Sequence, residues 1–410
     1  MIIKHITIRP ILDSNGYFTL AADFVLVDGK MVTASAGLNE LADHQAFDAR
    51  DGRKHTAFAL ANRPLMTRSA ALLNSDLVPQ ICNKEITPQE LDKKLLAWQT
   101  EHELEVAANS VLPLSLAGWR AAAADEPLYK FLAKAAGTTV DQPRLIINLF
   151  NGGRYGDTNL DFEEYLILPT AKKLSEQIKL GTEVYHHLGI ILAQAGFDTD
   201  VGSEGGYAPD IVSSAQAMEL MQAAALAAGY HSGRDYQLGL DLGANQLYDE
   251  NLGHYVFSLD RNYFSARTML DLYYAWLEKY PIGYLEDGLA EDDDDGWQAM
   301  TKALAGKVVL AGDELFLTKE NKLRERLNKK IGTATVARLA HNATVSQLLD
   351  FLILARKHGY ELVLSQDYGE TNDDFIVDLA VAVGAEYLKV GSLSRGERVA
   401  KYNRLLTIGD

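Results

Sequence analysis

Strand-like and helix-like patterns of apolar residues alternate along the chain, and their order changes near Arg144. Before that point, β-branched and aromatic residues predict strands over 2–11, 17–27 and 31–35. Helical patterns then predict helices over 64–73, 87–99 and 104–124. Asp28-Gly29 is typical of a hairpin turn, and Pro64 suits a first helical turn. Strands followed by helices indicate an α+β domain, which we place at residues 1–130.

From Arg144 onward, short apolar runs alternate with helical patterns. The runs cover residues 145–150, 164–168, 237–242, 282–286, 308–313, 335–339, 361–365 and 387–390. Helices are expected between the later runs, for example over 266–279, 345–356 and 373–383. A repeated short buried strand followed by a helix is typical of a parallel β/α barrel, an α/β fold that we place at residues 140–410. The second run follows the first after a short loop, which predicts an antiparallel hairpin at the opening of the barrel.

Three of these runs lead into an acidic residue at or next to their last position: Asp241, Glu286 and Asp313. In a barrel, the carboxyl ends of the strands converge on one rim, where active sites lie. One such acid is more often a helix cap or a solvated loop residue. Three acids at corresponding ends of successive predicted strands favour a shared site. Carboxylates held close together repel and raise one another's pKa unless a cation joins them. Ligands that offer only oxygen suit a hard cation, so the pattern predicts Mg²⁺.

Further charged residues fall near the same predicted rim. Glu164 opens the second run, and Glu204 lies in the glycine-rich segment 201–209. Glycines around an acid permit close approach of a ligand, but this segment lacks the lysine and the spacing of a phosphate-binding loop. Lys389 lies in the last run. If Lys389 faces the rim, it pairs with a substrate anion or acts as a base. The alternative is a surface lysine with no role in the site.

Composition limits the classes of function. The chain has 410 residues, a net charge of −17 and one cysteine, Cys82. The acidic balance disfavours nucleic acid and anionic lipid as general partners, because both are negatively charged. One cysteine excludes an intrachain disulfide and a cysteine-based zinc site. No stretch approaches the roughly 20 apolar residues of a membrane span, and no N-terminal targeting pattern is present, so we expect a cytoplasmic location and no membrane partner.

Several segments carry a more specific pattern than strands and helices require. They are Ile11-Leu-Asp-Ser-Asn-Gly16, Asn151-Gly-Gly153, Phe162-Glu-Glu-Tyr-Leu-Ile-Leu-Pro169, Val201-Gly-Ser-Glu-Gly-Gly-Tyr-Ala-Pro209, Leu285-Glu-Asp-Gly-Leu289, Asp295-Gly-Trp297, Ala311-Gly-Asp-Glu-Leu-Phe-Leu-Thr318, Gly369-Glu-Thr-Asn-Asp-Asp-Phe375, Leu388-Lys-Val-Gly391 and Arg395-Gly-Glu-Arg-Val-Ala-Lys-Tyr-Asn403. Together they resemble the enolase family, from near the N-terminus to the last residues. The resemblance implies an N-terminal α+β capping domain, an enolase-type β/α barrel whose second strand is antiparallel, and a homodimer or larger homo-oligomer.

The resemblance also implies a reaction and the roles of individual residues. The matched Mg²⁺ ligands are Asp241, Glu286 and Asp313, which agrees with the strand-end argument. Glu204 and Glu164 match the acids near the leaving hydroxyl group, with Glu204 the better general acid, and Lys389 would face the substrate carboxylate. In the family reaction, a base removes the proton α to a carboxylate, Mg²⁺ stabilises the resulting dianion, and an acid assists loss of the β-hydroxyl group.

Residues expected in the pocket depart from the family pattern. Arg338 stands where the family has its lysine base, and an arginine, with a pKa above ~12, is a poor base but a good partner for a carboxylate or phosphate. The family's His-Arg-Ser segment, which holds the substrate phosphate and lies near its carboxylate, is replaced by Gln366, Asp367 and Tyr368. An aspartate there would repel a phosphate and would suit a cationic or hydroxylated group.

Two loop positions differ as well. Glu40 replaces a serine that helps hold a second metal ion, and Tyr155 matches a loop histidine. We therefore predict a Mg²⁺-dependent carbon–oxygen lyase that acts on a small carboxylate-bearing substrate other than 2-phosphoglycerate, with Lys389 or an unidentified neighbour as the base. Two alternatives stay open. One is ordinary enolase activity on 2-phosphoglycerate with compensating residues, and the other is a non-catalytic enolase-like scaffold or interaction protein.

Overall fold

The computed structural model describes residues 1–38, 52–108 and 110–410. The Cα positions separate into two compact units. The first unit comprises residues 1–141, 337–354 and 365–384, and the second comprises residues 142–336, 355–364 and 385–410. Two segments from the later part of the chain therefore group with the N-terminal part.

The chain begins with a three-stranded antiparallel sheet in the order β1-β2-β3. Its strands are β1 (Ile3–Leu12), β2 (Phe18–Leu26) and β3 (Met31–Ser35). Ile6 and Ile8 lie two residues apart on β1 and are buried on one face of the sheet. At the β2–β3 turn, the carboxylate of Asp28 accepts the N–H of Lys30 at 2.9 Å, and Gly29 has a φ of +87°, which suits glycine. The predicted strands and hairpin are confirmed.

Helices follow this sheet in the first unit. They are α1 (Gly52–Leu72), a π-helix (Leu73–Leu77), α2 (Val78–Ile81), α3 (Pro88–Glu101), α4 (Leu112–Ala123) and α5 (Leu128–Ala136). α3 begins at a capping box, in which the side chains of Thr87 and Glu90 each accept the other residue's main-chain N–H. Pro88 occupies the first turn of α3, where its missing N–H costs no helical hydrogen bond.

Two predicted helix starts are wrong. α1 begins at Gly52, so Pro64 lies inside the helix rather than in its first turn. The alanine-rich residues 57–61 favour a helix before the proline. Inside the helix, Pro64 removes one main-chain hydrogen bond and crowds the preceding turn, a cost that α1 accommodates. The predicted helix 104–124 begins at Leu112 instead. Pro113 marks its first turn, and residues 102–105 form turns.

Eight strands form a closed barrel in the order β10-β11-β12-β13-β14-β4-β5-β6. They are β4 (Arg144–Asn151), β5 (Glu164–Pro169), β6 (Tyr236–Asp241), β10 (Ile282–Glu286), β11 (Val309–Gly312), β12 (Ala334–Arg338), β13 (Glu361–Ser365) and β14 (Tyr387–Lys389). β5 pairs antiparallel with both β4 and β6, whereas β6 and β10 are parallel, so the predicted opening hairpin is confirmed. Apolar side chains such as Ile146, Leu166 and Val336 form the core.

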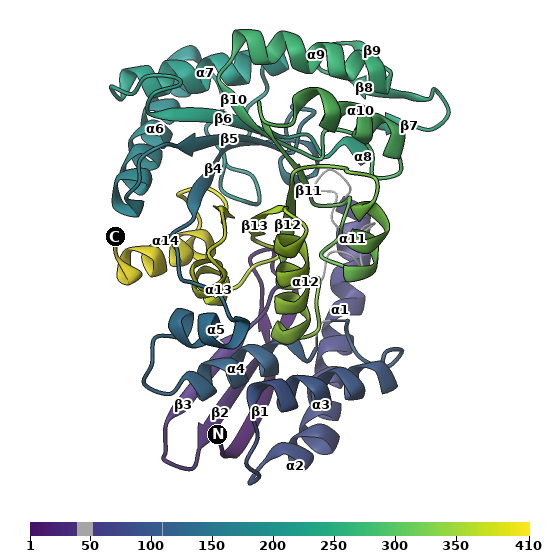
Figure 1. Cartoon of the computed structure of the whole chain (residues 1–410), viewed down its shortest axis with the longest axis vertical. Coiled ribbons are helices and arrows are strands. Elements are labelled where there is room, and N and C mark those ends of the chain that lie inside the picture. Colours follow the sequence, from purple (N-terminus) through teal and green to yellow (C-terminus); the bar gives the residue numbers. More distant parts are fainter. Residues whose placement is uncertain (39–51, 109) are drawn as a thin grey trace. The chain divides into compact units, whose positions relative to one another are not determined.

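Helices and a small sheet connect the barrel strands. They are a 3₁₀-helix (Gly153–Tyr155), α6 (Leu174–Ala195), α7 (Ser214–Ala227), α8 (Ala244–Leu247), β7 (Tyr248–Asp249), β8 (His254–Phe257), β9 (Asn262–Phe264), α9 (Ala266–Lys279), α10 (Asp294–Leu304), α11 (Glu320–Leu327), α12 (Val345–Lys357), α13 (Phe375–Val383) and α14 (Gly396–Ile408). Figure 1 shows α6, α7 and α9 on the outer side of β5, β6 and β10. None of the helices in the described ranges has the length and apolar character that crossing a membrane requires.

Candidate active site

Strand direction and register bring charged residues together at one rim of the barrel. Asp241 and Glu286 are the last residues of β6 and β10, and they are partners in the register of these parallel strands. Glu164 is the first residue of β5, which runs the opposite way, so it pairs with Asp241 at the same rim. Lys389 is the last residue of β14. Residues that are far apart in the sequence therefore meet because their strands end together.

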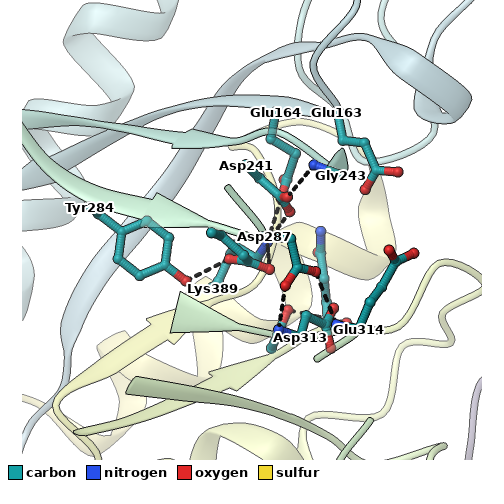
Figure 2. Close-up of polar contacts among 12 residues, drawn as sticks. Glu163, Glu164, Asp241, Gly243, Tyr284, Asp287, Asp313, Glu314 and Lys389 are labelled. Atoms are coloured by element: carbon teal, nitrogen blue, oxygen red, sulfur yellow. Dashed lines mark hydrogen bonds and ion pairs between the residues drawn. The ribbon is translucent and has the colours of Figure 1, made fainter. Parts of the chain in front are cut away.

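The ammonium group of Lys389 lies among three carboxylates (Figure 2). Its Nζ is 2.6 Å from Glu164 Oε2, 2.9 Å from Asp241 Oδ2 and 2.8 Å from Glu286 Oε1. The four side chains are at most 3% exposed, so water screens these contacts little. Burial disfavours the charge on Lys389, but the three carboxylates outweigh it and raise the pKa of the ammonium well above its ordinary value. In this state Lys389 is a charge partner rather than a base.

Two of these carboxylates also have a second hydrogen-bond donor. Glu286 Oε2 accepts the hydroxyl hydrogen of Tyr284 at 2.5 Å, and Asp241 Oδ1 accepts the N–H of Gly243 at 3.2 Å. Burial, followed by the charge of Asp241, raises the pKa of Glu286 well above its ordinary value, although Lys389 opposes the shift. The negative charge of the group therefore exceeds what the ammonium of Lys389 balances.

Glu204 reaches this group from the glycine-rich segment 201–209. The N–H of Ser392 donates to the main-chain carbonyl of Glu204 at 2.9 Å, which ties the segment to the residues after β14. Gly205 has a φ of +89°, and a Cβ at that position would lie 2.6 Å from Ser394 Oγ, so the turn requires glycine. Burial, and next the neighbouring carboxyl group of Glu204, raises the pKa of Glu164 well above its ordinary value. The surroundings of Glu164 therefore favour a bound proton on this residue.

A second group of acids lies beside the first (Figure 2). Arg154 contacts Glu163 Oε1 at 2.9 Å and Glu314 Oε1 at 3.1 Å. The carboxylate of Asp287 accepts the N–H groups of Asp313 and Glu314 at 3.0 and 2.9 Å. Burial raises the pKa of Glu163 to about 8, although Arg154 acts in the opposite direction. Excess negative charge thus extends from β6 and β10 to the loop after β11.

The strand pattern does not predict four residues of this region, which are Arg154, Tyr284, Asp287 and Glu314. A signal existed for Asp287 and Glu314, because each directly follows a predicted strand-end acid. Tyr284 lies two residues before Glu286, and residues with this spacing on a strand point to the same face. Arg154 gives no periodic signal, because it lies in the 3₁₀-helix Gly153–Tyr155.

The acids at the rim have donor atoms that suit a hard divalent cation. Asp241, Glu286 and Asp313 offer carboxylate oxygens, which Mg²⁺ prefers, and the charge of Asp313 contributes to the raised pKa of Glu286. In the described ranges, no three Asp, Glu, His or Cys side chains are arranged to hold a metal ion. The ammonium of Lys389 instead occupies a position between Asp241 and Glu286, where positive charge is favoured. The residues thus fit the ion by the chemistry of their donor atoms.

Three residues of the predicted pocket lie in the first unit, in two segments that hold each other. Arg338 ends β12, and its Nη1 donates to the main-chain carbonyl of Gln366 at 2.6 Å. Asp367 Oδ2 accepts the N–H of Ala340 at 3.2 Å. The side chains of Arg338, Gln366 and Asp367 are buried. Segments 338–340 and 366–367 are therefore fixed to one another, and the roles of these side chains toward a substrate stay predictions.

The other predicted pocket residues are Tyr368, which also lies in the first unit, Tyr155 and Glu40. Tyr368 is buried in the first unit, and its main-chain carbonyl accepts Asn15 Nδ2 at 3.4 Å. Tyr155 is buried in the second unit, and its carbonyl accepts the N–H of Ser203 at 2.8 Å. Tyr155 thereby supports the segment that carries Glu204. Glu40 lies outside the described residues.

Known protein families match both parts of the chain. The family model described as "Enolase, N-terminal domain" matches residues 3–132, and the model described as "Enolase, C-terminal TIM barrel domain" matches residues 140–410. The matches agree with the N-terminal sheet and helices and with the closed eight-stranded barrel. Because the two matches together span most of the sequence, the protein belongs to the enolase family.

Proposed function

We propose that this protein is a Mg²⁺-dependent carbon–oxygen lyase that removes the proton α to a carboxylate and eliminates a β-hydroxyl group from a small substrate other than 2-phosphoglycerate. Family membership supports the reaction class. The observation that carries the proposal is the buried group in which Glu164, Asp241 and Glu286 converge on one ammonium. Such a group favours further positive charge and a bound proton, and this reaction uses both.

The proposed site divides its acids between two tasks. Asp241, Glu286 and Asp313 would hold Mg²⁺. When bound, the ion supplies positive charge that stabilises the charge developing on the substrate carboxylate. Lys389 pairs with that carboxylate after leaving the acids that it contacts in this structure. Glu204 and Glu164 form a separate pair that handles the proton.

The proton transfers place different demands on the glutamates and on the base. The raised pKa of Glu164 favours a proton on this glutamate beside Glu204, and the pair gives it to the departing hydroxyl group. Arg338 cannot take the α-proton, because its guanidinium stays charged. Lys389 can take it only when its pKa falls, and separation from the three carboxylates lowers that pKa.

Asp367 is the reason to propose a substrate other than 2-phosphoglycerate. By its resemblance to the family pattern it stands where the family has its phosphate-binding arginine. It is 2% exposed and is held through Oδ2 by the N–H of Ala340. Two like charges ~4 Å apart repel by about 1 kcal/mol in water and by several kcal/mol in a drier pocket. A small carboxylate with a hydroxyl or cationic group at its far end avoids this repulsion.

The second candidate function is ordinary enolase activity, because both enolase domain models match the chain. A coupled assay for phosphoenolpyruvate separates the two. We expect 2-phosphoglycerate turnover at least about 100-fold below that of an ordinary enolase, since the charge that partners the phosphate is missing. Turnover within about tenfold, or roughly 1.4 kcal/mol in barrier, would establish the second function and overturn the substrate proposal.

Two further measurements complete this test. A variant that restores the family pattern should gain activity on 2-phosphoglycerate; its changes are Arg338→Lys, Gln366→His, Asp367→Arg and Tyr368→Ser. Wild-type protein should be stabilised against heat by millimolar Mg²⁺. Absence of both a Mg²⁺ effect and turnover on any β-hydroxy acid would indicate a non-catalytic scaffold. A homodimer or larger homo-oligomer is part of the proposal, and light scattering after size-exclusion chromatography measures it.

A further inference from the structure

Asp287 occupies a junction between the strands that carry the proposed metal ligands. It directly follows Glu286, the last residue of β10, and is 4% exposed. Its Oδ1 accepts the N–H of Asp313 at 3.0 Å, and its Oδ2 accepts the N–H of Glu314 at 2.9 Å (Figure 2). Both carboxylate oxygens of Asp287 are thus directed at the backbone that presents Asp313.

The main chain of Asp287 makes two more bonds to neighbouring strands or loops. Its N–H donates to the carbonyl of Ala311 on β11 at 3.0 Å, and its carbonyl accepts the N–H of Ala244 at 3.1 Å. The N–H of Leu242, next to Asp241, donates to the carbonyl of Glu286 at 3.1 Å. Asp287 and its neighbour therefore connect the ends of β6, β10 and β11, each of which carries one proposed ligand.

The backbone at Asp287 has an uncommon conformation. Its φ is +43°, in the left-handed region that few residues other than glycine adopt, although aspartate tolerates it better than most. The residues after Asp313 bend in a turn in which the carbonyl of Asp313 accepts the N–H of Leu317 at 2.7 Å. The first N–H groups of such a turn lack partners within it, and the Asp287 carboxylate supplies acceptors for two of them.

We propose that Asp287 is a positioning residue that sets where Asp313 lies relative to Asp241 and Glu286, and so determines how tightly the three acids bind a divalent cation. This inference rests on the proposed function, in which these acids hold Mg²⁺. Asp287 does not contact the ion in this role, because its two oxygens are engaged by N–H groups. Groups that orient metal ligands commonly alter affinity without touching the metal.

The variant Asp287→Asn tests the proposal directly. Asparagine keeps the size of the side chain but has one acceptor oxygen, so one of the two N–H groups loses its partner. Titration with Mg²⁺, followed by thermal unfolding, gives the half-saturating concentration. We expect it to rise about tenfold or more in Asp287→Asn, as for other residues that orient metal ligands.

Asp293→Asn is the matched control. Asp293 also uses a carboxylate to accept a backbone N–H, that of Gly296 at 2.9 Å, but at the start of α10 rather than between proposed ligands. Its half-saturating Mg²⁺ concentration should stay within about twofold of wild type. A similar weakening in both variants would overturn the positioning role, because it would reflect a general effect of losing a carboxylate that accepts a backbone N–H.

A double variant separates positioning from mere stability. If Asp287 acts through Asp313, then Asp287→Asn should weaken Mg²⁺ binding little further once Asp313→Asn is present, because residues that share one interaction are not additive. Full additivity would overturn the proposal. If Asp287→Asn does not fold, Asp287→Glu serves instead, because it keeps both acceptor oxygens and displaces them by one methylene group. Glu should then show intermediate affinity, and wild-type affinity would contradict a positional role.

The outcomes also distinguish this inference from the proposed function. No Mg²⁺ effect on wild-type protein would overturn the proposed function, and the positioning role with it. A clear Mg²⁺ effect on wild type that Asp287→Asn retains unchanged would leave the proposed function standing and overturn the positioning role alone.

Discussion

Two buried groups in this molecule combine a basic side chain with several carboxylates, yet the pKa shifts within them have opposite signs. In the first unit, Arg120 contacts the two oxygens of Asp373 at 2.6 and 2.8 Å and Asp374 Oδ1 at 2.7 Å. Although burial acts in the other direction, Arg120 holds the pKa of Asp373 below its ordinary value. This group connects α4 to the segment after β13.

In the second unit, Lys389 divides its hydrogen bonds among Glu164, Asp241 and Glu286, and the pKa values of Glu164 and Glu286 are raised. An arginine presents a planar fork that matches both oxygens of one carboxylate, whereas an ammonium makes single bonds to several. A basic residue among carboxylates thus forms a structural brace in the group of Arg120. In the group of Lys389 it leaves carboxylates that attract cations and protons.

Removal of each basic residue is expected to have the largest effect. Lys389→Met and Arg120→Met should each lower the free energy of unfolding at neutral pH by about 3–5 kcal/mol, because each leaves buried carboxylates without their partner. Millimolar Mg²⁺ should restore much of this loss in Lys389→Met, where a cation can take the place of the ammonium, and little in Arg120→Met. Urea unfolding with and without Mg²⁺ measures both. Equal responses of the two variants would break the comparison.

The pH dependence of stability should differ between Glu163, in the group of acids beside that of Lys389, and Asp373, in the group of Arg120. Glu163 has a pKa of about 8 in the folded protein against an ordinary 4.5, so the folded state keeps a proton that the unfolded chain releases between these values. Stability should therefore fall as pH rises through this window, by up to about 1.4 kcal/mol per pH unit from this residue. Glu163→Gln should flatten the decline in urea unfolding.

Asp373 provides the control of opposite sign. Its pKa is lowered on folding, so its contribution is complete above its ordinary value of 3.8 and is lost as pH falls through the folded value. Asp373→Asn should therefore lower the free energy of unfolding at neutral pH and reduce the further decrease of that free energy in acid. Above pH 4.5, the slope of the free energy of unfolding against pH should not change. A decline that persists unchanged in Glu163→Gln would assign the bound proton to another acid of the group.

The smallest expected effect comes from Tyr284→Phe, which keeps the ring in the barrel core and removes one hydroxyl group. That hydroxyl donates to Glu286 Oε2 at 2.5 Å, and a hydrogen bond to a charged group contributes about 1.5–3 kcal/mol. Tyr273→Phe is the matched control, because its hydroxyl donates at the same distance, 2.5 Å, to the neutral carbonyl of Gly288. It should cost about 1 kcal/mol. Equal losses in thermal unfolding would show that Glu286 carries little charge.

The strands could be predicted well from the sequence, because a buried barrel strand is a short apolar run with sharp ends. The predicted ranges 282–286 and 361–365 coincide with β10 and β13. The small sheet β7–β9 was not predicted, since its strands have only two to four residues and no room for a periodic pattern. Helix starts were less certain where a proline is compatible with both the interior and the first turn, as Pro64 shows.

The arrangement of side chains at the rim could be predicted only in part. The sequence places Asp241 and Glu286 at strand ends, and the structure brings them together there. The sequence cannot show that Lys389 Nζ donates to three acids, because these contacts depend on the closure of β14, β4, β5 and β6 into one barrel. The bonds of Asp287 depend on its positive φ, a local conformation that no periodic pattern reveals.

The reversed direction of β5 has a consequence for how this protein family can diversify. Residues 152–163 join the end of β4 to the start of β5 at the same rim, so the chain turns back without an intervening α-helix. Insertions or substitutions in this connection can reshape the entrance to the acids while the outer helices keep their places. Arg154 and Tyr155 already lie there. Because Tyr155 and Phe162 are buried there and Gly152 leaves no room for a Cβ, exposed positions such as Asp157 are the ones in this hairpin that can change without disturbing its packing.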